Sequence, residues 1–327
     1  MLIKVPRGWE LPERSAAPER VFRERRSLIK GLGLGMLAAA TPRLAAVARA
    51  EEDVEAPEDP SAALYPVPTN PRFADGGRPL TPEEMATTYN NYYEFGAVKK
   101  VWREAQALAI RPWEIRIDGL VEEPFTIGID ELLAKMPLEE RIYRHRCVEA
   151  WSIVVPYSGF PMKALLDLAR PLGSAKYVEM QTFENPEVAP VQLQSWYPWP
   201  YVEGLTLEEA AHELAFLATG YYGKPIPKQN GSPLRLAVPW KYGFKHVKAI
   251  VRFTLTETQP LNFWQEVDSN EYGFWANINP EVPHRRWSQA TEKDVATGER
   301  IPTLLYNGYA ELVSPLYAGL TDEPLFM

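Results

Sequence analysis

Cys147 is the only cysteine among 327 residues, and it limits how this chain can be stabilised. A single thiol excludes an internal disulfide, a zinc site made only of cysteines, and an iron–sulfur cluster held by this chain alone. The thiol follows the alternating run Arg141–Arg144, which predicts a strand, and an apolar patch and a turn at Ser158–Pro161 are expected after it. Cys147 is therefore expected at the end of a strand.

Two roles are open to this thiol. Arg146 and Glu149 flank it, and neighbouring cations favour the thiolate, which is the form that acts as a nucleophile or metal ligand. A buried cysteine can also pack as an inert small hydrophobic residue. From these residues alone, both roles stay open.

The composition predicts short strands joined by many loops rather than a helical bundle. The chain contains 31 Pro, 16 Tyr and 10 Trp, and its length fits one large domain or two coupled ones. Alternation and capping residues predict strands at residues 113–121, 175–182, 214–218, 234–238 and 248–256, and helices at 130–136, 162–169 and 205–212.

The net charge of −8 is unevenly distributed along the chain. Residues 1–50 carry ten Lys and Arg but only four Asp and Glu, so the remaining residues carry a net charge of −14. An acidic body argues against nucleic acid as a partner.

The first fifty residues have the pattern of a targeting segment. Arg25 and Arg26 precede a glycine-rich apolar run at residues 31–40, and Ala48–Ala50 is a small-x-small cleavage site. This resembles a twin-arginine export signal. A transmembrane anchor is the alternative, but residues 41–43 interrupt the apolar run and a span needs about 20 apolar residues. We therefore expect cleavage of this segment and no membrane insertion of the mature chain.

Two stretches combine polar and aromatic side chains. Residues 89–96, Tyr-Asn-Asn-Tyr-Tyr-Glu-Phe-Gly, suit the rim of a polar ligand, because a buried Asn needs partners for both its amide and its carbonyl. Residues 240–248 hold three lysines and a histidine among aromatics, and on an acidic body this cluster needs an anion such as phosphate. An ordinary aromatic loop and a solvated basic loop are the alternative interpretations.

Three further motifs resemble a known family. Residues 146–151 (RCVEAW), 230–235 (NGSPLR) and 239–245 (PWKYGFK) are similar to the sulfite-oxidase superfamily of molybdopterin enzymes. With the twin-arginine leader, residues 89–96, 201–204 and 286–291 narrow the resemblance to the catalytic subunits of periplasmic protein-methionine-sulfoxide reductases. The resemblance covers nearly the whole mature chain.

This resemblance implies a fold and a domain organisation. The fold is α+β, with mixed, largely antiparallel sheets and surrounding helices, which is the sulfite-oxidase molybdopterin-binding fold. We expect a signal peptide at residues 1–50, an extended Pro-rich acidic arm at 51–80, and a molybdopterin-binding catalytic domain at 81–327.

The implied cofactor is Mo-molybdopterin, in which the metal carries a dithiolene, oxo groups and one protein thiolate. The resemblance assigns that thiolate to Cys147. It implies contacts to the pterin and its phosphate for Asn90, Tyr93, Glu94, Thr182, Asn230, Arg235, His246, Val247 and Lys248. His246 departs from the family pattern, which has Gly there, so its contact is expected from the backbone N–H.

The implied reaction is oxygen-atom transfer. A methionine sulfoxide residue of a protein takes up two electrons and two protons, giving methionine and water. Glu149 is a catalytic candidate, because a negative charge near the metal favours a neutral sulfoxide over anionic sulfite. A structural salt bridge of Glu149 with Arg144 or Arg146 is the alternative.

The implied substrates are oxidised periplasmic proteins. The chain contains no CxxCH haem motif and no flavin fingerprint. The resemblance therefore implies a separate electron donor, a haem-containing membrane subunit, and a location in the periplasm.

Three other functions stay open. The first is a sulfite-oxidase-like or small S- or N-oxide reductase. The second is a cysteine hydrolase, with Cys147 as nucleophile and His145 or His246 as base. The third is a binding protein in which Cys147 is inert.

Overall fold

The computed structural model describes residues 59–327. The signal peptide and cleavage site expected within residues 1–50, and the first part of the arm at residues 51–58, lie outside this range. Residues 59–80 form two short turns of 3-10 helix, η2 (Pro60–Leu64) and η3 (Pro71–Phe73). The side chain of Tyr65 donates a hydrogen bond to Thr219, and the backbone N–H of Asn70 donates to Glu140.

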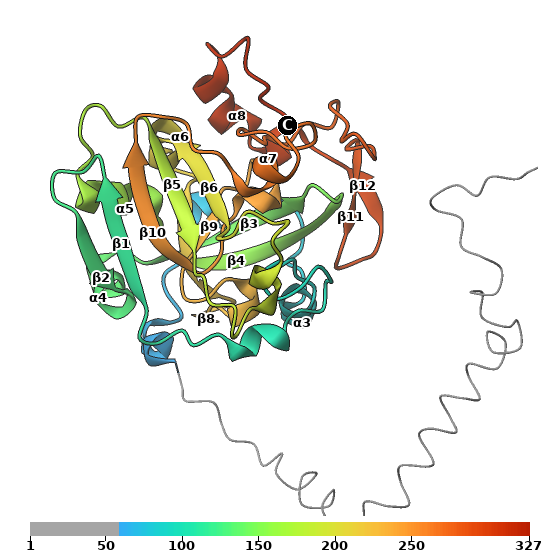
Figure 1. Ribbon diagram of the computed structural model, residues 1–327. Coiled ribbons are helices and arrows are strands. Elements are labelled where there is room, and N and C mark those ends of the chain that lie inside the picture. The colour runs from blue at the N-terminus through green and yellow to red at the C-terminus, as the bar shows by residue number, and fades with distance from the viewer. Residues whose placement is uncertain (1–58) are drawn as a thin grey trace, which may run out of the picture. The chain divides into compact units, whose positions relative to one another are not determined.

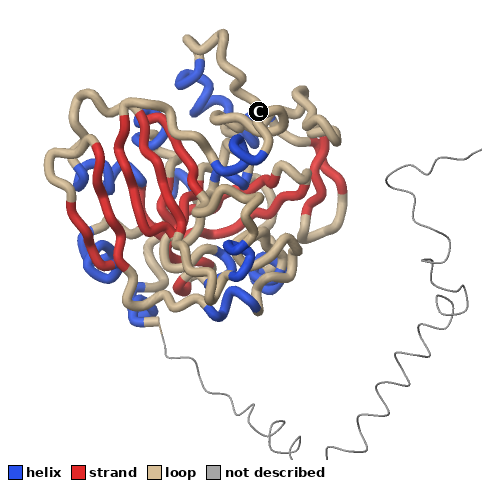
Figure 2. Tube along the Cα trace, viewed as in Figure 1, coloured by secondary structure: helices blue, strands red, loops and turns tan. Residues whose placement is uncertain are grey.

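The strands form two sheets. Figure 1 labels most of the strands, and Figure 2 shows them in red. The five-stranded sheet has the order β2 (Phe125–Gly128), β1 (Glu114–Gly119), β10 (Ile250–Thr256), β5 (Tyr177–Thr182), β6 (Val202–Thr206). The seven-stranded sheet has the path β12 (Arg300–Pro302), β11 (Thr291–Asp294), β4 (Trp151–Pro161), β7 (Phe216–Tyr221), β8 (Lys224–Pro225). In addition, β3 (Glu139–Cys147) pairs with β4, and β9 (Arg235–Ala237) pairs with β7.

The helices are short and lie around the sheets, as Figure 2 shows. They are α3 (Glu83–Thr88), α4 (Ile129–Lys135), α5 (Met162–Ala169), α6 (Leu207–Ala211), α7 (Phe263–Val267) and α8 (Ala310–Val313). Further 3-10 turns are η4 (Glu104–Ala107), η5 (Pro190–Leu193), η6 (Lys228–Asn230), η7 (Gly243–Lys245), η8 (Leu305–Gly308) and η9 (Ser314–Tyr317). Within residues 59–327, no helix has the length and hydropathy needed to cross a membrane.

The pairing of the strands confirms the expected α+β class. The contacts of β1 with β10 and of β11 with β4 are parallel, and the other pairings among the described strands are antiparallel. The sheets are therefore mixed and largely antiparallel.

Strand β4 is the centre of the larger sheet, and it corrects one prediction. The expected turn at Ser158–Pro161 is instead the last part of β4, paired with β7. A register shift between Ser158 and Gly159 accommodates the local irregularity. A Cβ on Gly159 would lie 2.1 Å from the carbonyl oxygen of Leu217, so glycine is needed there for close strand approach rather than for a turn.

Buried ion pairs fix the basic segment that follows β9. Lys241 pairs with Glu209 at 2.5 Å, and Lys245 pairs with Glu203 at 2.7 Å, with all four side chains almost fully buried. Two of the three lysines in residues 240–248 therefore have carboxylate partners in the core. The expectation that this whole cluster needs an external anion is wrong for Lys241 and Lys245.

Replacing Lys241 with Met is expected to lower the free energy of unfolding by about 3 kcal/mol, because it leaves the buried carboxylate of Glu209 without its cation. Lys163→Met is the matched control. Lys163 forms an exposed pair with Asp167, so its loss should cost less than about 1 kcal/mol. Chemical denaturation of the two variants measures the difference, and equal losses would contradict the assigned role of the buried pair.

Candidate active site

Cys147 lies at the turn between the two longest strands. Strand β3 ends at Cys147 and β4 begins at Trp151, and these two residues are the last pair of the β3–β4 ladder. The three residues between them form a tight turn, in which the N–H of Ala150 donates to the carbonyl of Cys147 at 3.0 Å. Ala150 has a left-handed φ of 61°, which is uncommon outside glycine. The turn therefore holds the thiol in a fixed place.

The neighbouring arginine faces away from the sulfur. Arg146 is fully buried and forms an ion pair with Glu292 at 3.2 Å, while its Nη2 donates to the carbonyl of Gln289. Successive side chains of a strand point to opposite faces, so Arg146 and Cys147 cannot share one. The charge of Arg146 favours the thiolate, as the sequence indicated, but burial and the Glu149 carboxylate outweigh this effect on the pKa of Cys147. Through Glu292 and Gln289, Arg146 anchors the Cys147 strand to β11 and to the segment before it.

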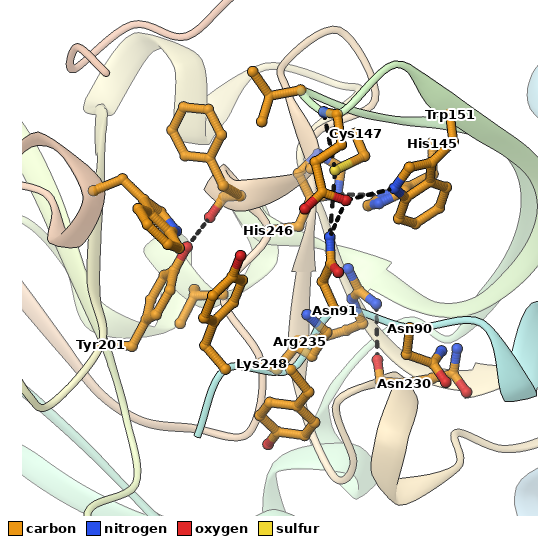
Figure 3. A pocket seen from close by; sticks show the side chains of 18 of the residues that line it. Asn90, Asn91, His145, Cys147, Trp151, Tyr201, Asn230, Arg235, His246 and Lys248 are labelled. Atoms are coloured by element: carbon orange, nitrogen blue, oxygen red, sulfur yellow. Dashed lines mark hydrogen bonds between the residues drawn. The ribbon is translucent and has the colours of Figure 1, made fainter. Parts of the chain in front are cut away.

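A cavity of about 540 Å³ opens beside Cys147, and Figure 3 shows its wall. Of the residues that sequence reasoning assigned to the site, the cavity is lined by Asn90, Tyr93, Glu94, Cys147, Glu149, Asn230, Arg235, His246, Val247 and Lys248. Thr182 does not line it. The Thr182 hydroxyl donates to the carbonyl of Lys248 at 2.7 Å, so this residue supports the wall from behind.

Polar groups surround the sulfur at one end of the cavity. The Nδ2 of Asn91 lies 3.4 Å from Sγ of Cys147 and 3.3 Å from Oε2 of Glu149, and the N–H of Glu149 lies 3.5 Å from Sγ. Glu149 forms an ion pair with Lys99 and accepts a hydrogen bond from Trp151 at 3.0 Å. Its carboxylate thus lies beside the sulfur, as one hypothesis required. Its salt-bridge partner is Lys99, so the alternative pairing with Arg144 or Arg146 is wrong.

These surroundings favour a neutral thiol at Cys147 and a charged carboxylate at Glu149. Burial raises the pKa of the Cys147 thiol to about 12, and the nearby Glu149 carboxylate adds to the rise. Burial also disfavours the charged form of Glu149, but Lys99, Trp151 and Asn91 outweigh it and hold the pKa of Glu149 below its usual value. At neutral pH a negative carboxylate therefore faces a protonated thiol in the protein alone.

The other end of the cavity is cationic. Arg235 is buried and Lys248 is half-buried, and desolvation lowers the pKa of Lys248, with the charge of Arg235 adding to the effect. Glu94 partly offsets the two cations, although burial raises the pKa of this carboxyl. The Nη2 of Arg235 has no hydrogen-bond partner among the described residues. A buried arginine and a half-buried lysine, offset only by one weakly ionised carboxyl, form a binding site for an anion.

Two amides line the cavity near Arg235. The Nδ2 atoms of Asn90 and Asn230 both donate to the carbonyl of Ala86, at 3.3 and 3.0 Å. This shared anchor fixes both amide planes. Neither Oδ1 atom has a partner within residues 59–327. A buried acceptor without a partner is costly, so both oxygens fit a ligand that carries N–H or O–H donors.

Two histidines form a neutral pair in the cavity wall. The Nε2 of His246 lies 2.9 Å from the carbonyl of Val238, which can only accept, so this nitrogen carries the proton. The Nδ1 of His246 then accepts from the Nδ1 of His145, 3.2 Å away. Burial lowers the pKa of both rings well below the usual value, so both are neutral.

The histidine contacts bear on two predictions. The backbone N–H of His246 donates to the carbonyl of Gly243 at 3.1 Å, so it is already used and does not serve as the expected ligand donor. Among the described residues, the hydrogen-bonding groups at the Cys147 sulfur are Asn91 and the N–H of Glu149, and neither is a histidine. With the raised thiol pKa, this geometry argues against a cysteine hydrolase.

Sequence reasoning missed part of the wall. The residues not assigned to the site include Asn91, Trp151, Tyr197, Tyr201, Trp264, Tyr272 and Trp287. Asn91 lies inside the polar stretch at residues 89–96, so its amide was a visible signal. Trp151, Tyr201 and Trp287 lie within the motifs that carry the family resemblance, whereas Tyr197, Trp264 and Tyr272 come from segments of weak periodicity and are marked by their clustering in space. Tyr93 packs edge-on against Trp264 with ring centroids 4.8 Å apart, and the rings of Trp264 and Tyr272 are 5.2 Å apart.

Comparisons with known proteins identify the family to which the chain is related. Residues 103–264 match a domain family described as "Oxidoreductase molybdopterin binding domain". The chain is 44% identical to the "Protein-methionine-sulfoxide reductase catalytic subunit MsrP" of Pseudomonas syringae pv. tomato, over 98% of each chain. Among solved structures, it is similar to the sulfane dehydrogenase SoxCD of Paracoccus pantotrophus, with 20% identity and a TM-score of 0.39, over 46% of this chain and 40% of that one.

The thiol environment leads to a prediction on reactivity. In cofactor-free folded protein at pH 8, Cys147 should react with iodoacetamide at least about a hundredfold more slowly than free cysteine, because a pKa near 12 leaves little thiolate. The rate should rise with pH and become ordinary in denaturant. Mass spectrometry of the alkylated chain measures it, and rapid labelling of the folded protein at neutral pH would show an activated thiolate instead.

Proposed function

The chain belongs to the family of protein-methionine-sulfoxide reductase catalytic subunits, which are molybdopterin-binding oxidoreductases, and we propose that it reduces methionine sulfoxide residues in proteins at a molybdenum held by Cys147. One observation carries the proposal: a lone sulfur and a set of unmatched anion- and donor-binding groups line the same cavity. A sulfite-oxidase-like activity is the second candidate, and it differs in the charge of its substrate.

The cavity fits the cofactor group by group. Cys147 would supply the thiolate ligand of molybdenum, and a bound metal would favour deprotonation of a thiol that the protein alone keeps protonated. Arg235 and Lys248 would hold the phosphate as a fork and a point charge. The free oxygens of Asn90 and Asn230 would accept hydrogen bonds from the pterin ring. Tyr93, Glu94 and Val247 line the cavity and complete the proposed contacts, and Thr182 acts through Lys248.

The bound cofactor supplies the two-electron chemistry that removes oxygen from the sulfoxide. The chain's own residues select and place the substrate. Glu149 keeps a negative charge beside the sulfur, which disfavours an anion such as sulfite and tolerates a neutral sulfoxide. The aromatic wall of Tyr93, Trp264 and Tyr272 offers apolar surface for a thioether side chain.

Exposed apolar residues outside the cavity support a protein as the substrate. Leu193 and Trp196 are 72% and 69% exposed, and Trp196 contacts Tyr197, which lines the cavity. Leu261 is 55% exposed and lies just before α7, which carries Trp264. Large apolar side chains left in water next to a cavity are typical of a surface that binds another macromolecule. The polypeptide around a methionine sulfoxide would lie on this surface.

The proposed partners and location extend the family assignment. A catalytic subunit implies a second subunit, and we propose a membrane haem protein as the electron donor. We further propose export through the twin-arginine route and oxidised periplasmic proteins as substrates, on the basis of Arg25, Arg26 and the apolar run that follows them.

Metal analysis of purified protein tests the proposal. Folded protein from a molybdenum-replete host should hold about one molybdenum per chain and, with a chemical electron donor, should reduce methionine sulfoxide in an oxidised protein. Cys147→Ser should lose both properties while keeping its fold by circular dichroism. Metal-free protein with full activity would contradict the proposal, and so would a Cys147→Ser variant that keeps molybdenum and activity.

Substitution of Glu149 tests the charge argument separately. Glu149→Gln removes the negative charge beside the sulfur, so kcat/KM for sulfite should rise by roughly tenfold relative to that for a sulfoxide, which corresponds to about 1.4 kcal/mol. Steady-state kinetics with both substrates at equal molybdenum content measure the ratio. Glu179→Gln, on the other sheet, is the control. An unchanged ratio would remove Glu149 as the source of substrate preference.

A further inference from the structure

Lys99 reaches two groups beside the Cys147 sulfur. Its ammonium contacts the Oδ1 of Asn91 and the carboxylate of Glu149. Its own backbone carbonyl accepts a hydrogen bond from the N–H of Asn90 at 2.9 Å, so the loop is tied to the polar stretch at residues 89–96. The Lys99 side chain is 25% exposed, which places the ion pair at the edge of the cavity rather than in the core.

The Lys99 contact fixes which way the Asn91 amide faces. An ammonium has three donors and no acceptor, so only the carbonyl oxygen of the amide can face it. The NH₂ group must then face the other side, where it lies 3.4 Å from Sγ of Cys147 and 3.3 Å from Oε2 of Glu149. Without Lys99, a half-turn of the amide would place its oxygen against the sulfur. The lysine, facing the oxygen, and the Glu149 carboxylate, facing the NH₂ group, thus favour the same one of the two amide orientations.

The position of the Glu149 carboxylate depends less on Lys99 than the orientation of the Asn91 amide does. Its Oε2 also accepts from the indole N–H of Trp151 at 3.0 Å, and its backbone lies in the turn that follows Cys147. Among the described residues, Lys99 is the group that donates to the Oδ1 of Asn91. Loss of Lys99 would therefore change the orientation of Asn91 more than the position of Glu149.

We propose that Lys99 is a positioning residue that acts through Asn91 to keep an N–H donor on the Cys147 sulfur. The inference rests on the proposed function, in which that sulfur binds molybdenum. A hydrogen bond to a metal-bound thiolate withdraws electron density from the sulfur and raises the reduction potential of the metal. Lys99 thereby tunes the metal without touching it.

The test is a comparison of Lys99→Met with Lys99→Gln in the molybdenum-loaded protein. Redox titration followed by electron paramagnetic resonance of the Mo(V) state gives the midpoint potential and its spectrum. Lys99→Met should shift the potential to a lower value and alter the spectrum. Lys99→Gln keeps a neutral N–H donor toward Oδ1, so it should remain closer to the wild type. If both variants shift equally, Lys99 acts by its charge alone and the proposal is wrong.

A double-mutant cycle separates the Asn91 route from a direct effect. Asn91→Leu should reproduce the shift of Lys99→Met, and the double variant should shift no further, because both changes remove the same donor. Additive shifts would overturn the proposal, as would an unchanged potential in Lys99→Met. If Lys99→Met does not retain molybdenum, Asn91→Leu and Lys99→Gln carry the test: Asn91→Leu should lower the potential and Lys99→Gln should not, and an unchanged potential in Asn91→Leu would overturn the proposal. Wild-type protein without molybdenum would instead refute the proposed function.

Discussion

The turn between β3 and β4 is the constraint on which the site depends. It places Cys147 and Trp151 opposite each other at the end of the longest ladder among the described strands, where the last residues of β3 and nearly all of β4 are buried. Strand alternation then separates two tasks. Arg146 points to one face, where its ion pair with Glu292 ties the hairpin to β11, and Cys147 points to the other, where it meets the cavity. A shift of one residue in this register would bury the sulfur in the structural layer and place the guanidinium in the site.

The buried charged groups also fall into two classes, one that stabilises the core and one that faces the cavity. The core contains cations that are matched by carboxylates, such as Lys241 and Lys245, and these hold the loop that forms one wall of the cavity. Arg235 is also buried and Lys248 is half-buried, but these two cations lack a full complement of negative charge. Removing such charges from water is costly unless an anion pairs with them, so this end of the cavity favours an anionic ligand. The family membership and this unmatched charge lead independently to the same kind of ligand.

The sequence predicts the class of fold and most of the residues that the structure brings together around the cavity, but for different reasons. Alternation and apolar runs locate strands such as β1, β5 and β10, because each has one buried face. The turn expected at Ser158–Pro161 fails, because pairing with β7 overrides the local preference of Gly and Pro. Resemblance, and not periodicity, brings the cofactor residues together. Neither periodicity nor the family resemblance indicated a role for Lys99, because that role depends on contacts among residues 91, 99 and 149 that only the folded structure shows.

In the proposed function the sulfur of Cys147 is a ligand of molybdenum. X-ray absorption spectroscopy at the molybdenum edge can detect this bond, because sulfur and oxygen neighbours of the metal give distinct scattering. Cys147→Ser is expected to lose most of its molybdenum, so the measurement uses wild-type protein beside any fraction of the variant that retains the metal. We expect molybdenum to have three sulfur neighbours in the wild type, two from the dithiolene and one from Cys147. In the variant we expect only the two dithiolene sulfurs. A wild-type spectrum that requires only the two dithiolene sulfurs would contradict it.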